Sequence, residues 1–147
     1  MGIVYFTCYG VAAPQGSKVK TRHGMRESSA RLKPWRGQVA LAAAEEMHRQ
    51  GHGTRVLDGP VRVHATFILP RPKGHFGTGK NAAKLKLSAP VYPTVAPDVD
   101  KCARAILDAI TGIIVRDDSQ VADLYAAKRY GEPARVEVSV AEMQEEA

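Results

Sequence analysis

The stretch APDVDKCARAILDAI, residues 96–110, contains two aspartates two positions apart at the start of a helical pattern. Asp98 suits a helix N-cap, where a carboxylate accepts a backbone N–H, and Asp100 in the first turn would favour the helix dipole. Apolar residues recur on one face of the pattern, while Asp100, Arg104 and Asp108 share another face by their i, i+4 spacing. The stretch therefore predicts an amphipathic helix that begins at an acidic pair.

A second acidic pair, Asp117 and Asp118, follows the apolar run GIIV. On its own this segment is typical of a turn. If the chain turns after Gly112 and returns along the helix, the second pair would approach the first. Carboxylates gathered there would repel one another unless a cation neutralised them, and Mg²⁺ or Mn²⁺ prefers such oxygen ligands. The two pairs together predict a metal centre able to hydrolyse a phosphodiester, which is the chemistry of a nuclease.

Strand and helix patterns surround these motifs. Their order indicates an α+β or mixed α/β fold, with a small mixed sheet packed against two main helices in a single domain over residues 1–147. The last two strands are predicted to pair as a hairpin. The predicted strands cover about residues 3–11, 60–70, 121–129 and 134–140, and the predicted helices cover about 34–50 and 98–111.

Two segments without a steady apolar period are predicted to be exposed, mobile basic loops, at about residues 13–33 and 71–97. Loops of this length in compact domains are usually functional or disordered. The charge distribution agrees with a role in binding. Residues 1–90 hold 15 Lys and Arg against 4 Asp and Glu, a net charge of +11, whereas residues 91–147 hold 6 against 11, a net charge of −5. The basic part favours a polyanionic partner such as DNA or RNA.

Other features narrow the class of protein. No apolar run approaches the roughly 20 residues of a membrane span, so no membrane partner is expected. The N-terminus lacks the pattern of a signal peptide, which predicts a cytoplasmic protein. Cys8 and Cys102 are then expected to be free buried thiols instead of a disulfide.

The run PDVDKCARAILDAITGIIVRDDSQVADLYAAKRY, residues 97–130, resembles the signature of the RusA family of Holliday junction resolvases. That signature reads approximately Pro-Asp-x-Asp-Asn, then Lys, then Asp-Ala-Leu, then Asp-Asp-x-Gln-Val, with a Lys further on. ESSARLKPWR and the basic segment before APVYPT also resemble phage-borne members, so the resemblance covers most of the chain. A DxD motif alone is common, but a DxD followed at this distance by DDSQ is specific.

The resemblance implies roles for individual residues. Asp98 and Asp100 match the family's paired metal-binding aspartates, and Asp118 matches its third catalytic acid, with Asp117 in a supporting role. The implied cofactor is Mg²⁺, with Mn²⁺ as its substitute. The implied protein is a homodimer, encoded by a phage or prophage, that nicks two strands of a four-way DNA junction symmetrically in recombination and repair.

Two positions depart from the family pattern, because Lys101 replaces its common Asn and Arg104 replaces its usual catalytic Lys. Arginine does not donate a proton at ordinary pH, but its planar fork clamps a phosphate, so we expect Arg104 to act electrostatically. Other cations are expected to contact DNA phosphates. They are Lys18, Lys20, Arg22, Lys33, Arg36, Lys80, Lys84, Lys86 and Lys128.

Three alternatives remain open. GHFGTGKN, residues 74–81, imitates a nucleotide-binding P-loop, but Asn81 replaces the metal-binding Ser or Thr and no room is left for the helix that must follow, so no nucleotide cofactor is expected. A DxD motif also occurs in metal-dependent transferases, against which the basic loops argue. The third alternative is a branched-DNA-binding protein without catalysis, in which the acids only cap a helix.

Overall fold

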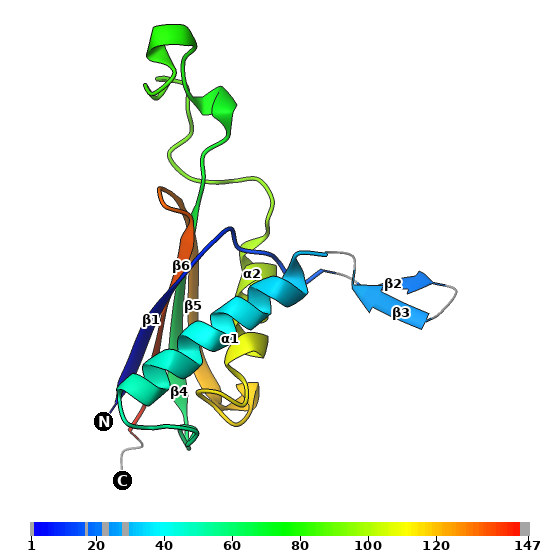
Figure 1. Cartoon of the computed structure of the whole chain (residues 1–147), viewed down its shortest axis with the longest axis vertical. Helices are drawn as coiled ribbons and strands as arrows, with labels where there is room; N and C mark the ends of the chain where they lie inside the picture. The colour runs from blue at the N-terminus through cyan, green and yellow to red at the C-terminus, as the bar shows by residue number, and fades with distance from the viewer. Residues whose placement is uncertain (1, 17, 22–23, 28–29, 145–147) are drawn as a thin grey trace.

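The centre of the computed structural model, which describes residues 2–16, 18–21, 24–27 and 30–144, is a four-stranded mixed sheet. Two helices, α1 and α2, cover one face of this sheet (Figure 1). This confirms the predicted α+β class with a small mixed sheet and two main helices. The strands are β1 (Ile3–Tyr9), β4 (Val61–Leu69), β5 (Val121–Tyr130) and β6 (Arg135–Glu142), and the helices are α1 (Leu32–Arg49) and α2 (Val99–Ile110).

The predicted hairpin between the last two strands is wrong, because the sheet order is β1-β6-β4-β5. β6 lies antiparallel between β1 and β4, and β5 lies parallel to β4 at the edge. Val136, Val138 and Val140 of β6 are fully buried, so this strand needs a central position where its apolar face meets the helices. β5 is exposed at successive residues from Ala122 to Tyr125, as an edge strand can be.

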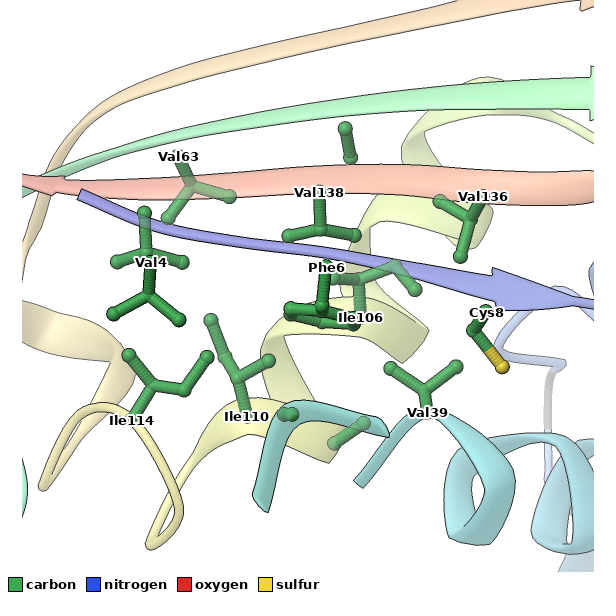
Figure 2. Close-up of a cluster of buried hydrophobic side chains, with 14 of the residues drawn as sticks. Val4, Phe6, Cys8, Val39, Val63, Ile106, Ile110, Ile114, Val136 and Val138 are labelled. Atoms are coloured by element: carbon green, nitrogen blue, oxygen red, sulfur yellow. The ribbon is translucent and has the colours of Figure 1, made fainter. Parts of the chain in front are cut away.

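The core forms between the sheet and the helices. Figure 2 shows Val4 and Phe6 of β1 facing Val39 of α1 and Ile106 and Ile110 of α2, all of them buried. Each such aliphatic or aromatic side chain contributes about 1.5–3 kcal/mol when removed from water. The helical spacing of the apolar residues in α2 therefore fixes which of its faces remains in solvent. Both cysteines are buried free thiols, as predicted.

The predicted basic loop at 13–33 contains more structure than expected. β2 (Lys18–Thr21) and β3 (Gly24–Glu27) pair antiparallel and project sideways from the body (Figure 1). Their sequences lack the apolar alternation of a strand that packs on a core, which is why the ribbon was missed. Among the predicted DNA contacts, Arg22 lies outside the described residues, and so do the side chains of Lys18 and Lys20.

Residues 71–97 contain only two single-turn helices, η1 (Lys73–His75) and η2 (Gly79–Asn81). We call residues 71–90 the arm. Figure 1 shows the arm, in green, projecting beyond the end of the sheet at which α2 begins. Within the arm, Phe76 and Leu85 form an isolated antiparallel bridge. The P-loop-like motif lies here, and no α-helix follows η2 before residue 99, so the nucleotide-binding alternative lacks the helix it requires.

Candidate active site

The acidic pair at the start of α2 is exposed. Asp98 occupies the N-cap position in an extended conformation, with φ −71° and ψ 136°, as predicted. Within the described part of the chain, however, no backbone N–H donates to its carboxylate. Its side chain is 61% exposed, and its only ion pair there is with Lys101 at 3.8 Å. Helix capping therefore does not account for this carboxylate, and an exposed ion pair of this kind contributes little stability.

Asp100 and Arg104 lie one helical turn apart on the exposed side of α2. No hydrogen bond or ion pair engages either side chain among the described residues. Beneath them, the pKa of the Cys102 thiol is raised to about 11, chiefly by burial; the positive charge of Lys128 opposes the shift, and the negative charges of Asp98 and Asp100 add to it. These four ionisable groups therefore share one neighbourhood, and Cys102 stays a neutral thiol at physiological pH.

Lys128 of β5 fixes the segment that leads into α2. Its Nζ donates hydrogen bonds to the carbonyl oxygens of Val95, at 2.8 Å, and Pro97, at 2.9 Å. These bonds attach the approach to Asp98 to the neighbouring strand. Lys128 was predicted to contact phosphate, whereas the geometry engages its ammonium inside the protein. Sequence analysis could not assign this contact because it joins positions far apart in the chain.

Two basic segments leave the body near the start of α2. The amide of Gln15, shortly before β2, donates to the carbonyl of Lys101 at 3.0 Å, so the root of the β2–β3 ribbon lies against the first turn of α2. Lys33 is exposed in the first turn of α1. Arg36, one turn further, forms a 3.6 Å ion pair with Asp108 and so is partly engaged inside the molecule. The start of α2, which carries the acidic pair, therefore lies between the roots of the ribbon and the arm (Figure 1).

The second acidic pair precedes β5, at η3 (Asp118–Gln120). Asp117 caps this turn through a capping box with Gln120, and the Ser119 N–H donates to Asp117 Oδ2 at 3.1 Å. Hydrogen bonds from Ser119 lower the pKa of the Asp117 carboxyl below its usual value. This capping box was not predicted from the sequence, although its Asp-x-x-Gln spacing resembles the capping signature. Asp118 is exposed, and no hydrogen bond or ion pair holds its carboxylate in the described chain.

The expectation that the second pair returns to the start of α2 within one chain is wrong. From Val121 to Lys128, β5 advances roughly 23 Å at about 3.3 Å per residue. Because it is the Lys128 end of β5 that meets the start of α2, Asp118 lies at the opposite end of the strand. Across the described residues, no three Asp, Glu, His or Cys side chains come close enough to hold a metal ion.

Arg71 holds the base of the arm. Its Nη1 donates to the carbonyl of Pro90 at 2.7 Å, and its guanidinium carbon lies 4.5 Å from the centre of the Tyr130 ring. His75 meets the same ring edge-on at 5.3 Å. The two ends of the arm and the end of β5 are thereby joined. Sequence analysis did not single out Arg71 because its partners are distant in the chain.

The helices of the described chain include none that is both long and apolar enough to cross a membrane. A model of the family described as endodeoxyribonuclease RusA matches residues 10–141. The uncharacterized protein YqaN of Bacillus subtilis (strain 168) is 35% identical in an alignment 147 residues long. The match covers 97% of this chain and 99% of that protein. The region matched by the family model includes α2, both acidic pairs and the arm.

Proposed function

The chain belongs to the RusA endodeoxyribonuclease family, and from this we propose that it is a Mg²⁺-dependent endonuclease that resolves four-way DNA junctions by paired, symmetric nicks. The observation that carries the proposal is the acidic pair. Asp98 and Asp100 are exposed at a helix start, neither carboxylate caps the helix among the residues that the structure describes, and Lys128 fixes the approach to them. Carboxylates presented in this way are suited to hold a cation beside a phosphate.

The donor set fits a hard divalent ion. Mg²⁺ commonly retains water and takes carboxylates together with substrate phosphate, and Mn²⁺ accepts the same oxygen ligands. When bound, such an ion polarises the phosphodiester, generates a hydroxide nucleophile and stabilises the leaving oxygen. Asp98 and Asp100 would hold it.

The neighbouring cations complete the local chemistry. Arg104 is exposed one turn from Asp100 and can clamp a phosphate oxygen with its planar fork. Lys101 adds a second positive charge beside Asp98. Both charges would offset the repulsion between the acidic pair and the DNA backbone. The exposed Lys33, Lys80, Lys84 and Lys86 remain our candidates for phosphate contacts further from the cut.

We further propose that a homodimer completes each site. Asp118 is too far from Asp98 in its own chain, but β5 is an edge strand with Leu124 49% exposed and Tyr125 60% exposed. Exposed edges with apolar side chains are templates for pairing. Antiparallel pairing about a two-fold axis at Leu124 would set Asp118 of the partner subunit opposite Tyr130, just beyond Lys128. Each site would then combine Asp98 and Asp100 of one subunit with the partner's Asp118.

The experiment that tests the function is incubation of an end-labelled four-way junction with the protein, with and without Mg²⁺, followed by mapping of nicks on all four strands. We expect two nicks on strands of like polarity, at symmetric positions, only when Mg²⁺ is present. A linear duplex of the same sequence serves as the control substrate. A protein that shifts the junction but leaves all four strands intact is a non-catalytic DNA-binding protein, and the proposed function is then wrong.

A further inference from the structure

The arm presents an apolar side chain that is fully exposed to solvent. Leu87 has 107% relative exposure, the highest among the exposed large apolar residues of the described chain. It follows Lys86 directly and lies three positions after Lys84, both of which are exposed. Leu85, which alternates with the two lysines, is 49% exposed. Leu87, wholly in water beside Lys86, has no structural role in the arm itself.

The arm is braced where it meets the body and along its length. Arg71 bonds the Pro90 carbonyl and lies over Tyr130. Further out, the two legs are joined by hydrogen bonds from Lys86 N to the His75 oxygen, at 2.9 Å, and from Gly77 N to the Lys84 oxygen, at 3.0 Å. A segment ordered in this way loses less conformational freedom on binding than a flexible loop does.

The charge of the arm indicates what it meets. Residues 71–90 contain Arg71 and the four lysines at 73, 80, 84 and 86, and no Asp or Glu. Such a surface favours a polyanion. An apolar side chain close to phosphate-binding cations is the device with which proteins wedge into DNA, unstacking a base step at a cost of a few kcal/mol.

We propose that the arm inserts Leu87 into the base stack beside the branch point, with Lys84 and Lys86 on the flanking phosphates; this rests on the proposed junction-resolving function. The distance that the chain can span between Leu87 and Asp98 is compatible with this arrangement. Leu87 lies eleven residues before Asp98, a span of at most about 40 Å when fully extended. One turn of B-DNA is about 34–36 Å long. The wedge and the acidic pair thus lie within about one helical turn on the same junction.

The test uses the full-length protein and a four-way junction with 2-aminopurine at the base pairs that flank the branch point, in EDTA so that no strand is cut. Unstacking raises the fluorescence of this base. We expect the wild-type protein to raise it, Leu87→Ala to reduce the rise by about threefold or more, and Leu87→Phe to preserve it. Leu41→Ala is the matched control, because Leu41 is 61% exposed on α1, away from the arm.

The outcomes separate the wedge from the proposed function. A wild-type protein that binds and cuts the junction, with Leu87→Ala unstacking it equally well, overturns the wedge and leaves the function standing. A wild-type protein that neither binds nor cuts overturns both. If Leu87→Ala instead lowers the dimer fraction in sedimentation and leaves the fluorescence rise intact, Leu87 contacts a second copy of this chain, and the wedge is wrong.

Discussion

Asp98 shows how far a single residue can be interpreted from sequence. Its position as the N-cap of α2 follows from the preceding proline and the apolar period, and the structure confirms that position. Whether its carboxylate caps the helix does not follow, because that depends on how the approaching chain is held. Lys128 holds it, from a strand that sequence patterns do not place beside the helix. Sequence therefore identified the candidate acids, while the distant residue that positions them emerged only from the fold.

Replacement of Asp100 tests its assignment as a metal ligand. Asp100→Asn should reduce junction cleavage by more than about 100-fold, since loss of even an outer-shell partner of a metal site typically costs 10–100-fold. Binding to the junction should be retained or tightened, because a negative charge near phosphate is removed. Nick assays and gel shifts on the same preparation measure both effects. Glu45→Gln, which removes an exposed carboxylate of α1, is the control; cleavage by Asp100→Asn at the wild-type rate would refute the assignment.

Replacement of Lys128 distinguishes a positioning residue from a phosphate contact. Lys128→Met leaves the carbonyls of Val95 and Pro97 without their donor, so the free energy of unfolding should fall by about 1.5–3 kcal/mol, the usual contribution of hydrogen bonds to a charged group. Cleavage should fall as the approach to Asp98 loosens. The dependence of junction affinity on salt should be unchanged, because the ammonium does not neutralise a phosphate.

The comparison variant for Lys128 is Lys84→Met, which removes an exposed lysine of the arm. Log affinity falls as log salt concentration rises, and each phosphate-contacting lysine makes this slope steeper by about 0.9. Lys84→Met should therefore make the slope shallower, whereas Lys128→Met should leave it unchanged. A reduced slope for Lys128→Met, with unchanged stability, would show that its ammonium leaves the two carbonyls to bind DNA.

At the scale of elements, local patterns predicted both main helices and all four strands of the sheet, but not how the strands pair. Alternation marked 134–140 as a strand, and proximity in sequence suggested β5 as its partner. β6 instead lies between β1 and β4, since its three buried valines need the helices above them. The pairing of the strands is decided by the core that they share, and the residues of that core come from distant parts of the sequence. The β2–β3 ribbon escaped prediction for the related reason that it packs on no core.

The free edge of β5 leads to a prediction about assembly. Leu124→Lys adds a charge at the proposed two-fold axis, where it would face its own copy, and like charges directly opposite on paired strands are destabilising. We expect the dimer to dissociate in sedimentation and cleavage to be lost, while the free energy of unfolding measured on the monomer changes by less than about 0.5 kcal/mol, as for most surface substitutions. Leu41→Lys, at an exposed position on α1, should leave assembly and cleavage unchanged. A Leu124→Lys protein that stays dimeric and active would place the interface elsewhere.

At the scale of the whole molecule, the asymmetry of charge along the chain becomes an asymmetry in space. The basic part supplies the projecting ribbon and the arm, and the acidic part supplies α2 and η3. That division was readable from sequence. The relation between the two acidic pairs was not, because β5 separates them by most of its length in one subunit. If the pairs act together, they do so across two copies of the chain.

Mixing two inactive variants tests whether the site is shared between subunits. Homodimers of Asp100→Asn and of Asp118→Asn should both be inactive. In a mixed dimer with shared sites, one site carries both substitutions and the other carries neither. Equal amounts of the two variants, exchanged to equilibrium, should therefore recover about one quarter of the wild-type sites, since half of the dimers are mixed and each of these has one intact site.

The products of that mixture should differ in kind as well as in amount. A mixed dimer with one intact site should leave a singly nicked junction, whereas the wild-type protein leaves paired nicks. Asp98→Asn mixed with Asp100→Asn is the control, because both substitutions lie in the same half of the site and every mixed dimer then has two damaged sites. If each site were instead formed within one chain, Asp100→Asn mixed with Asp118→Asn would recover nothing. Recovery in the first mixture and none in the control would assign the partner's Asp118 to the acidic pair of α2.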